Sequence, residues 1–160
     1  MNDATSASPT PKWYLPVAIV AVLWNLVGCV NLAFELFAQD ALIESWSAAQ
    51  QEWARSIPAW IYVIYAVAVT MGVAGSRGLL LRQPGTTVLF AISLFAVVVQ
   101  MTYTMGIAGG LTVLGPSAAI TPAMVIAIAT LLLGVSVHSK NSGWLSRLCA
   151  SSRPSPQINS

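Results

Sequence analysis

Four long apolar segments constrain what this chain can fold into more than any other feature of its sequence. Each segment has roughly the 20 residues that an α-helix needs to cross a hydrocarbon core about 30 Å thick. Such segments cross as helices, because lipid offers backbone N–H and C=O groups no hydrogen-bond partner. We therefore predict an all-α, polytopic bundle of four transmembrane helices, over residues 13–37, 58–81, 87–108 and 117–138.

Composition agrees with a membrane protein. Of the 160 residues, 56% are hydrophobic and 8% are charged, whereas a soluble domain carries about 25% charged residues. So few charges cannot cover a surface that faces water. Residues 13–138 are predicted to form one membrane domain, with a disordered tail over 1–12 and a second tail over 139–160.

The positive charges predict the orientation of the bundle. Lys and Arg accumulate in cytoplasmic loops and tails. All of them except Arg55 flank the same side of the four segments. We therefore expect both termini to be cytoplasmic. These residues are Lys12, Arg77, Arg82, Lys140, Arg147 and Arg153.

The loop between the first two segments has a helical pattern of its own. Apolar residues recur at steps of three and four, which places them on one face of a helix, and Asp40 is positioned to cap its N-terminus. We expect a short amphipathic helix in this outer loop, either packed as a lid on the bundle or engaged in substrate gating or partner docking. Its apolar face comprises Leu42, Trp46, Ala49, Trp53 and Ile57.

Small residues line one face of the second segment. Gly72, Gly75 and Gly78 follow one another at steps of three. Such a face lets a neighbouring helix approach closely. Packing within the bundle and dimerisation are the two uses that this pattern allows.

Polar side chains inside the apolar segments are the candidates for function, because polar groups in a bilayer are costly. At 1.5 Å per residue, Asn25 lies about 18 Å and Gln100 about 20 Å above the cytoplasmic end of their segments, Tyr103 about 24 Å and Asn31 about 27 Å. These four could line one cavity as hydrogen-bonding groups, with Trp24 as a stacking surface. The alternative is that the amides join helices, each for about 1 kcal/mol.

Catalysis is not indicated. The segments carry no carboxylate at mid-membrane, and no Ser/His/Asp, Cys/His or paired-carboxylate constellation is visible. We expect a protein that is not an enzyme, with no cofactor and no metal site.

Short motifs along the chain show a family resemblance. The motifs are Lys12-Trp13-Tyr14, Leu23-Trp24-Asn25-Leu26-Val27-Gly28, Pro58-Ala59-Trp60, Leu79-Leu80-Leu81-Arg82, Ser93-Leu94, Gln100-Met101-Thr102-Tyr103, Gly115-Pro116-Ser117-Ala118 and Gly143-Trp144-Leu145. Together they resemble the small bacterial inner-membrane proteins commonly labelled "sugar transporter", from about Lys12 to Leu145. The resemblance implies a four-helix protein of the inner membrane that handles a sugar. The chain departs from that pattern at Gly75-Ser76-Arg77-Gly78, where an uninterrupted apolar run is expected.

Two functions follow as hypotheses. The first is an integral inner-membrane protein that binds or transports a neutral small solute, such as a sugar, and that needs a homodimer for transport. The second is a structural or accessory subunit that docks a larger envelope complex through the Trp46/Trp53 helix or the Gly72/Gly75 face. A polar cavity would favour the first and a filled core the second. Membrane lipid is an expected partner in both, and no nucleic-acid partner is expected.

Overall fold

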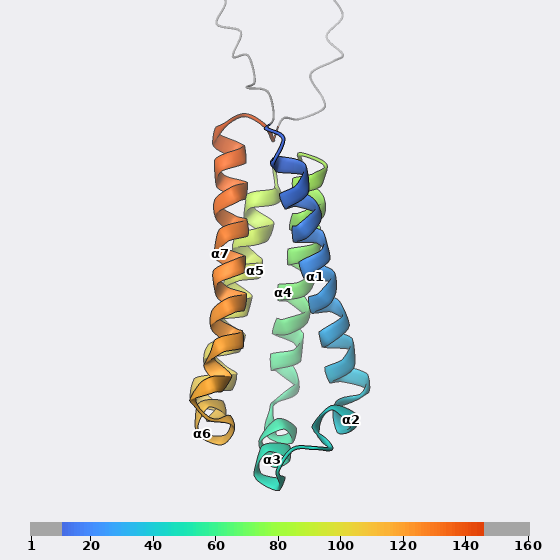
Figure 1. The fold of residues 1–160 in the computed structure, drawn as a ribbon, viewed down its shortest axis with the longest axis vertical. Coiled ribbons are helices and arrows are strands. Elements are labelled where there is room, and N and C mark those ends of the chain that lie inside the picture. The colour runs from blue at the N-terminus through green and yellow to red at the C-terminus, as the bar shows by residue number, and fades with distance from the viewer. Residues whose placement is uncertain (1–10, 146–160) are drawn as a thin grey trace, which may run out of the picture.

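The computed structural model describes residues 11–145, and within them four helices are long and apolar enough to cross a membrane. They are α1 (Tyr14–Phe37), α4 (Ala59–Leu80), α5 (Thr86–Met101), which continues as a π-helix over Thr102–Ile107, and α7 (Ile120–Asn141) (Figure 1). The chain is a multi-pass, all-α membrane protein, as predicted. The predicted spans agree with these helices to within a few residues. Arg147 and Arg153, which contributed to the predicted orientation, lie outside the described residues.

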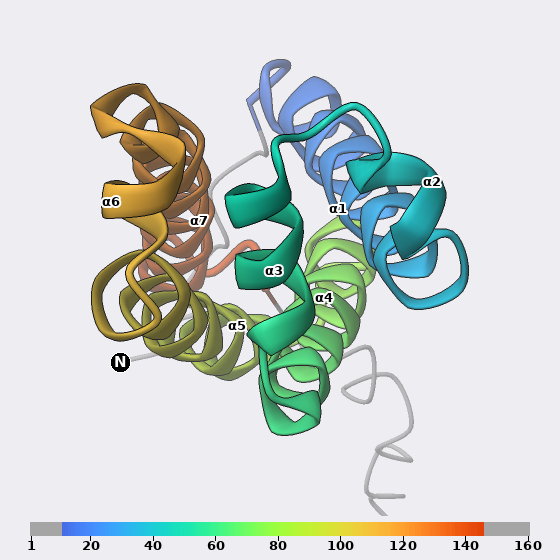
Figure 2. The same cartoon turned by 90° about the horizontal axis from the view of Figure 1, so that it is seen from below.

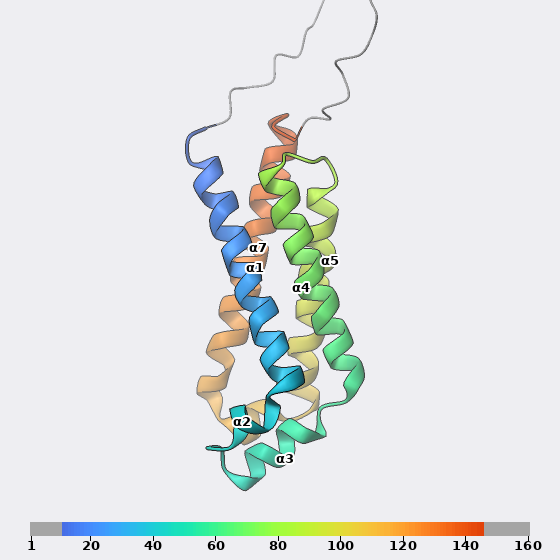
Figure 3. The same cartoon turned by 90° about the vertical axis from the view of Figure 1, so that its right-hand side faces the viewer.

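Short helices gather at the end of the bundle that lies opposite the start of α1 and the end of α7 (Figure 1). We call this the α3 end and the opposite one the terminal end. Here lie α2 (Gln39–Ile43), α3 (Ala48–Ser56), α6 (Gly110–Leu114) and a 3₁₀-helix over Pro116–Ala119. Side views show α2 and α3 lying across the bundle rather than along it (Figure 3).

The loop prediction was wrong in one respect, because α2 and α3 are separate helices and Asp40 does not cap a single long one. Ser47 is extended and begins α3: its hydroxyl accepts from the Gln50 backbone N–H (3.4 Å), and the Gln50 side chain accepts from the Ser47 N–H (3.1 Å). Such a reciprocal capping box satisfies two N–H groups that a helix start leaves free. Asp40 instead forms an exposed ion pair with Arg55 (3.0 Å) between the two helices.

The spanning helices pack in a row rather than a closed ring. Among the described helices, α1 packs along α4, α4 along α5, and α5 along α7, whereas α1 and α7 do not form such a pair. Viewed from the α3 end, α1 and α7 stand on opposite sides of α3 (Figure 2). The tight turn 81–85 makes α4 and α5 antiparallel neighbours, and α4 and α5 are therefore the inner helices of the row.

The glycine face of α4 is used inside the bundle. A Cβ atom at Gly72 would collide with the Asn25 side chain of α1, and one at Gly75 would lie 3.1 Å from the Phe90 ring of α5. A Cβ at Gly78 would lie 2.5 Å from the Thr86 hydroxyl. Glycine therefore allows α1 and α5 to approach the α4 backbone closely. Packing within the bundle was one of the two predicted uses of this face.

An aromatic cluster holds α1 and α7 together at the terminal end. The Trp144 ring packs edge-on against Trp13, Tyr14 and His138, with centroids 5.3–5.9 Å apart. Gly143 makes this possible, because its φ of +72° reverses the chain after α7. The Tyr14 hydroxyl also donates to the Leu79 carbonyl of α4 (2.6 Å). We call Trp13, Tyr14, His138 and Trp144 the terminal cluster.

The packing predicts that Gly72→Leu destabilises the bundle. The added side chain meets Asn25 in a filled contact, and overpacking of this kind costs about 1–3 kcal/mol. The matched control is Gly134→Leu in α7, since a Cβ at Gly134 meets nothing within 4 Å. Unfolding of both variants in mixed micelles, followed by circular dichroism, measures the difference. Equal stability of the two variants would contradict the packing described here.

Candidate functional site

A cavity of about 810 Å³ lies inside the bundle, from its middle to the α3 end. Its wall is formed by α1, α4, α5 and α7, and side chains of α2 and α3 cover it. Apolar side chains make up most of the lining. The polar ones are Asn25, Asn31, Glu35, Gln39, Tyr62, Tyr65, Ser93, Gln100, Thr104 and Thr121.

Most of the predicted solute-binding residues meet in this cavity. Trp24, Asn25 and Asn31 line it from α1, and Gln100 lines it from α5. Tyr103 is not part of the lining. Its ring instead packs edge-on against Trp60, with centroids 4.7 Å apart.

Tyr103 lies in the π-helix that follows Gln100. The Ala108 N–H donates to the Tyr103 carbonyl five residues earlier (2.7 Å), so this turn is wider than in an α-helix. Thr104 keeps the α-helical step of four from Gln100, because its hydroxyl donates to the Gln100 carbonyl (3.0 Å), and Thr104 lines the cavity. The sequence shows no signal for this π-helix, and the assignment of Tyr103 assumed α-helical spacing throughout.

Asn25 joins two helices. Its side-chain NH₂ donates to the Ala21 carbonyl on α1 (2.8 Å) and to the Ser76 hydroxyl on α4 (2.9 Å). Ser76 is fully buried, and its hydroxyl lies 2.8 Å from the Gly72 carbonyl. We call this group the α1–α4 clasp. The amides were predicted either to bind a solute or to join helices. Asn25 joins α1 to α4, and it also lines the cavity.

Gln100 differs from Asn25, because its side chain makes no hydrogen bond to any described residue. Gln100 is buried, and its Oε1 has no partner. A buried polar group without a partner costs about 1–3 kcal/mol. The side chain faces the cavity beside Ser93, whose hydroxyl donates to the Ala68 carbonyl (2.7 Å). Gln100 therefore offers an unused amide to whatever occupies the cavity.

A polar network lies toward the α3 end. The Asn31 side chain donates to Glu35 Oε1 (3.3 Å) and to the Tyr65 hydroxyl (3.2 Å), and the Gln39 side chain donates to the Tyr62 hydroxyl (3.1 Å). Glu35 and Gln39 were not among the predicted site residues. Glu35 lies four residues after Asn31 and so shares its helical face, whereas Gln39 lies beyond the end of α1, in α2, and the sequence gives no signal for its position.

The charge of the lining limits what it can bind. Within the described residues 11–145, the lining of the cavity contains one carboxylate, that of Glu35, and no Lys, Arg or His. An anionic ligand would meet no cation here and would be repelled by an ionised Glu35. The described residues also hold no group of three His, Cys, Asp or Glu side chains that could bind a metal ion. The described lining therefore offers hydrogen bonds but no positive charge, which disfavours an anionic ligand.

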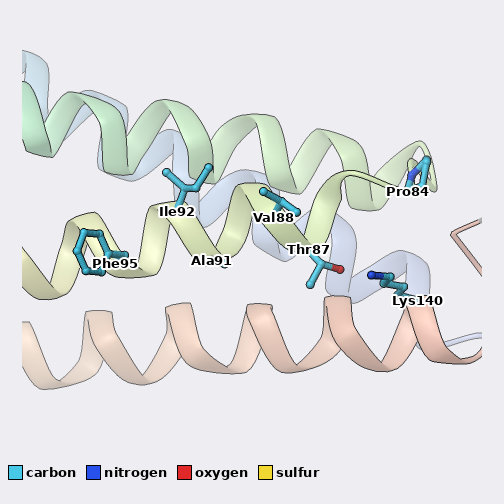
Figure 4. A pocket seen from close by; sticks show the side chains of 7 residues that line it. All are labelled: Pro84, Thr87, Val88, Ala91, Ile92, Phe95 and Lys140. Carbon is cyan, nitrogen blue, oxygen red and sulfur yellow. The ribbon is translucent and has the colours of Figure 1, made fainter.

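A second hollow, of about 410 Å³, lies between α5 and α7 near the terminal end. It shares no lining residue with the central cavity. Val88 and Phe95 form part of its lining and are exposed. Thr87 and Lys140 approach each other across it from the two helices (Figure 4). Because the rest of its lining is apolar, the central cavity is the better candidate site.

Replacement by leucine is predicted to lower the stability of the protein at Asn25 but not at Gln100. Asn25→Leu removes the α1–α4 clasp and lowers the free energy of unfolding by about 1 kcal/mol. Gln100→Leu removes an unpartnered buried amide, so stability is unchanged or higher. A double-mutant cycle of Asn25→Leu with Ser76→Ala, measured by unfolding in mixed micelles, should show coupling. Equal losses for Asn25→Leu and Gln100→Leu would contradict the difference between the two sites.

Comparison with known proteins gives no relative to place beside this geometry. No protein-family model, no curated protein and no solved structure matches the chain. The resemblance to proteins labelled "sugar transporter" stays a prediction, and the functional interpretation rests on the cavity itself.

Proposed function

We propose that the protein is an integral inner-membrane protein whose central cavity binds or transports a neutral small solute rich in hydroxyl groups, such as a sugar. The observation that carries this proposal is the Gln100 amide, which lies buried in the cavity wall without a partner. A hydroxyl of the solute can donate to Oε1, and the amide NH₂ can donate in return.

The remaining lining supports the same solute chemistry. Amide and hydroxyl groups supply further hydrogen bonds, and the rings of Trp24, Tyr62 and Tyr65 offer surfaces for the apolar faces of a sugar. The volume of about 810 Å³ falls within the 300–1,000 Å³ that is typical of small-molecule sites. Because cationic side chains are absent from the described lining, the solute is neutral rather than anionic.

The distribution of charge supports the location and orientation that we propose. Lys12, Arg82 and Lys140 all flank the terminal end of the spanning helices, whereas Arg55 lies on α3. An excess of Lys and Arg favours the cytoplasmic side. The terminal end is then cytoplasmic, and the cavity lies toward the outer side of the inner membrane.

The alternative of an accessory subunit receives less support. Trp53 lines the cavity and lies against Gly110, so it is not free to dock a partner. Gly72 and Gly75 are occupied by Asn25 and Phe90. Trp53, Gly72 and Gly75 are therefore used within the chain, whereas Trp46 lines the cavity and is still 37% exposed. The core contains a cavity rather than being filled.

Solute binding predicts a rise in melting temperature, because a ligand of the folded state stabilises it by mass action. The stabilisation reaches about 2.7 kcal/mol at 100 times the dissociation constant. We would measure melting against a panel of neutral sugars and polyols, in a detergent without a glycosyl head group. The rise should depend on dose and should be smaller in Gln100→Leu.

Thr70→Val is the matched control, because Thr70 is exposed and its hydroxyl bonds only to carbonyls of its own helix. This variant should respond like the wild type. A sugar acid matched to a neutral sugar should give no shift. If no neutral compound shifts the melting temperature, or if Gln100→Leu responds fully, the proposed function is wrong.

A further inference from the structure

The wall of the central cavity is incomplete between α1 and α7. Among the described helices these two do not pack along each other, and the terminal cluster joins them at one end only. Val27 on α1 and Met124 on α7 both line the cavity, yet they are 62% and 47% exposed. Side chains that line a cavity and are also exposed mark the place where it opens.

Other side chains and short helices pack over parts of the two ends of the bundle. Toward the terminal end, Phe90 packs with Tyr14, Leu79 and Leu145 in a buried cluster. At the α3 end, α3 packs against α6, and a Cβ at Gly110 would lie only 2.9 Å from the Trp53 ring. α3 lies across the bundle at this end (Figure 2). The side between α1 and α7 is therefore one way into the cavity, and the α3 end is another, because Leu42 and Trp46 line the cavity there and are 44% and 37% exposed.

This side opening lies at the depth of the bilayer. Val27 is about 20 Å along α1 from Tyr14, and Met124 is about 6 Å along α7 from its first residue. A hydrocarbon core of about 30 Å covers both positions. A molecule that enters between α1 and α7 comes from the lipid phase, not from water.

The chemistry of the walls is divided in a way that suits such a molecule. Hydrogen-bonding groups come mainly from α1, α4 and α5, and the deepest unpartnered one is on Gln100. Beyond Thr121, α7 contributes only apolar side chains within the described lining: Pro122, Met124, Val125, Ala129 and Leu132. One wall can bind a polar head group and the facing wall an apolar chain.

We propose that the ligand is an amphiphile dissolved in the bilayer, with an uncharged head that carries hydroxyl or amide groups and a single apolar chain. It enters between α1 and α7, its head bonds to Gln100 and its chain lies along α7. This inference rests on the proposed function, because it names the class of solute that the same cavity accepts.

Photolabelling in the membrane tests the inference. The protein is exchanged from detergent into phosphatidylcholine nanodiscs, and the probes are octyl glucoside, octyl galactoside and octyl maltoside that carry a diazirine at the chain end. Mass spectrometry should place saturable labelling at Met124, Val125 or Leu132. The reference position is Leu131, which is 68% exposed and does not line the cavity.

Variants distinguish entry of the probe into the cavity from simple partitioning of the probe into the surrounding lipid. Val27→Trp with Met124→Trp should block the opening and reduce labelling at Leu132, whereas Leu131→Trp should leave it unchanged. Gln100→Leu should weaken binding roughly two- to tenfold, as expected for one hydrogen bond. Circular dichroism and melting of each variant confirm that it is folded.

Competition distinguishes the two proposals. Unlabelled octyl glycoside should displace the probe, and the free sugar at the same concentration should not. Displacement by the free sugar as well would overturn the amphiphile inference while supporting the proposed function. If all probes label Leu131 as strongly as the cavity residues, and no sugar shifts the melting temperature, both proposals fail.

Discussion

The structure depends on one constraint: inside lipid, a polar group must find its hydrogen-bond partner within the protein. Helices satisfy the backbone, and buried hydroxyls bond to carbonyls, as Thr104 does with Gln100 (3.0 Å) and Ser139 with Val135 (2.7 Å). The Asn25 side-chain NH₂ donates to the Ser76 hydroxyl across α1 and α4. Among the described side chains of the four spanning helices, Gln100 has the buried polar atom that lacks a partner, and for that reason it carries the functional interpretation.

The order in which the four spanning helices pack leaves a cavity inside the bundle. α4 and α5 are joined by a short turn and form the inner pair, while α1 and α7 each pack against one of them. The outer helices are joined by the terminal cluster but diverge toward the α3 end (Figure 1). A bundle built in this way has a cavity whose polar lining side chains come mainly from α1, α4 and α5, while α7 contributes mostly apolar ones.

Much of the fold and part of the site could be predicted from the sequence. The spans follow from segment length and hydropathy, and Trp24, Asn31 and Gln100 reach the cavity because they lie at matching depths on helices of the same direction. Tyr103 could not be placed, because its ring packs against Trp60 of α4, a contact that depends on how two separate helices meet. The break between α2 and α3 was missed, because the apolar period continues through Ser47.

The sequence by itself determined that this chain crosses a membrane as helices, since local hydropathy and backbone hydrogen bonding decide that without any partner helix. Only the tertiary structure decided which amide joins helices and which remains free. Asn25 meets Ser76 because Gly72 lets α1 approach α4, whereas Gln100 faces a space that no neighbouring side chain fills. Contacts between distant segments decide this difference, and two amides in apolar helices look alike in sequence.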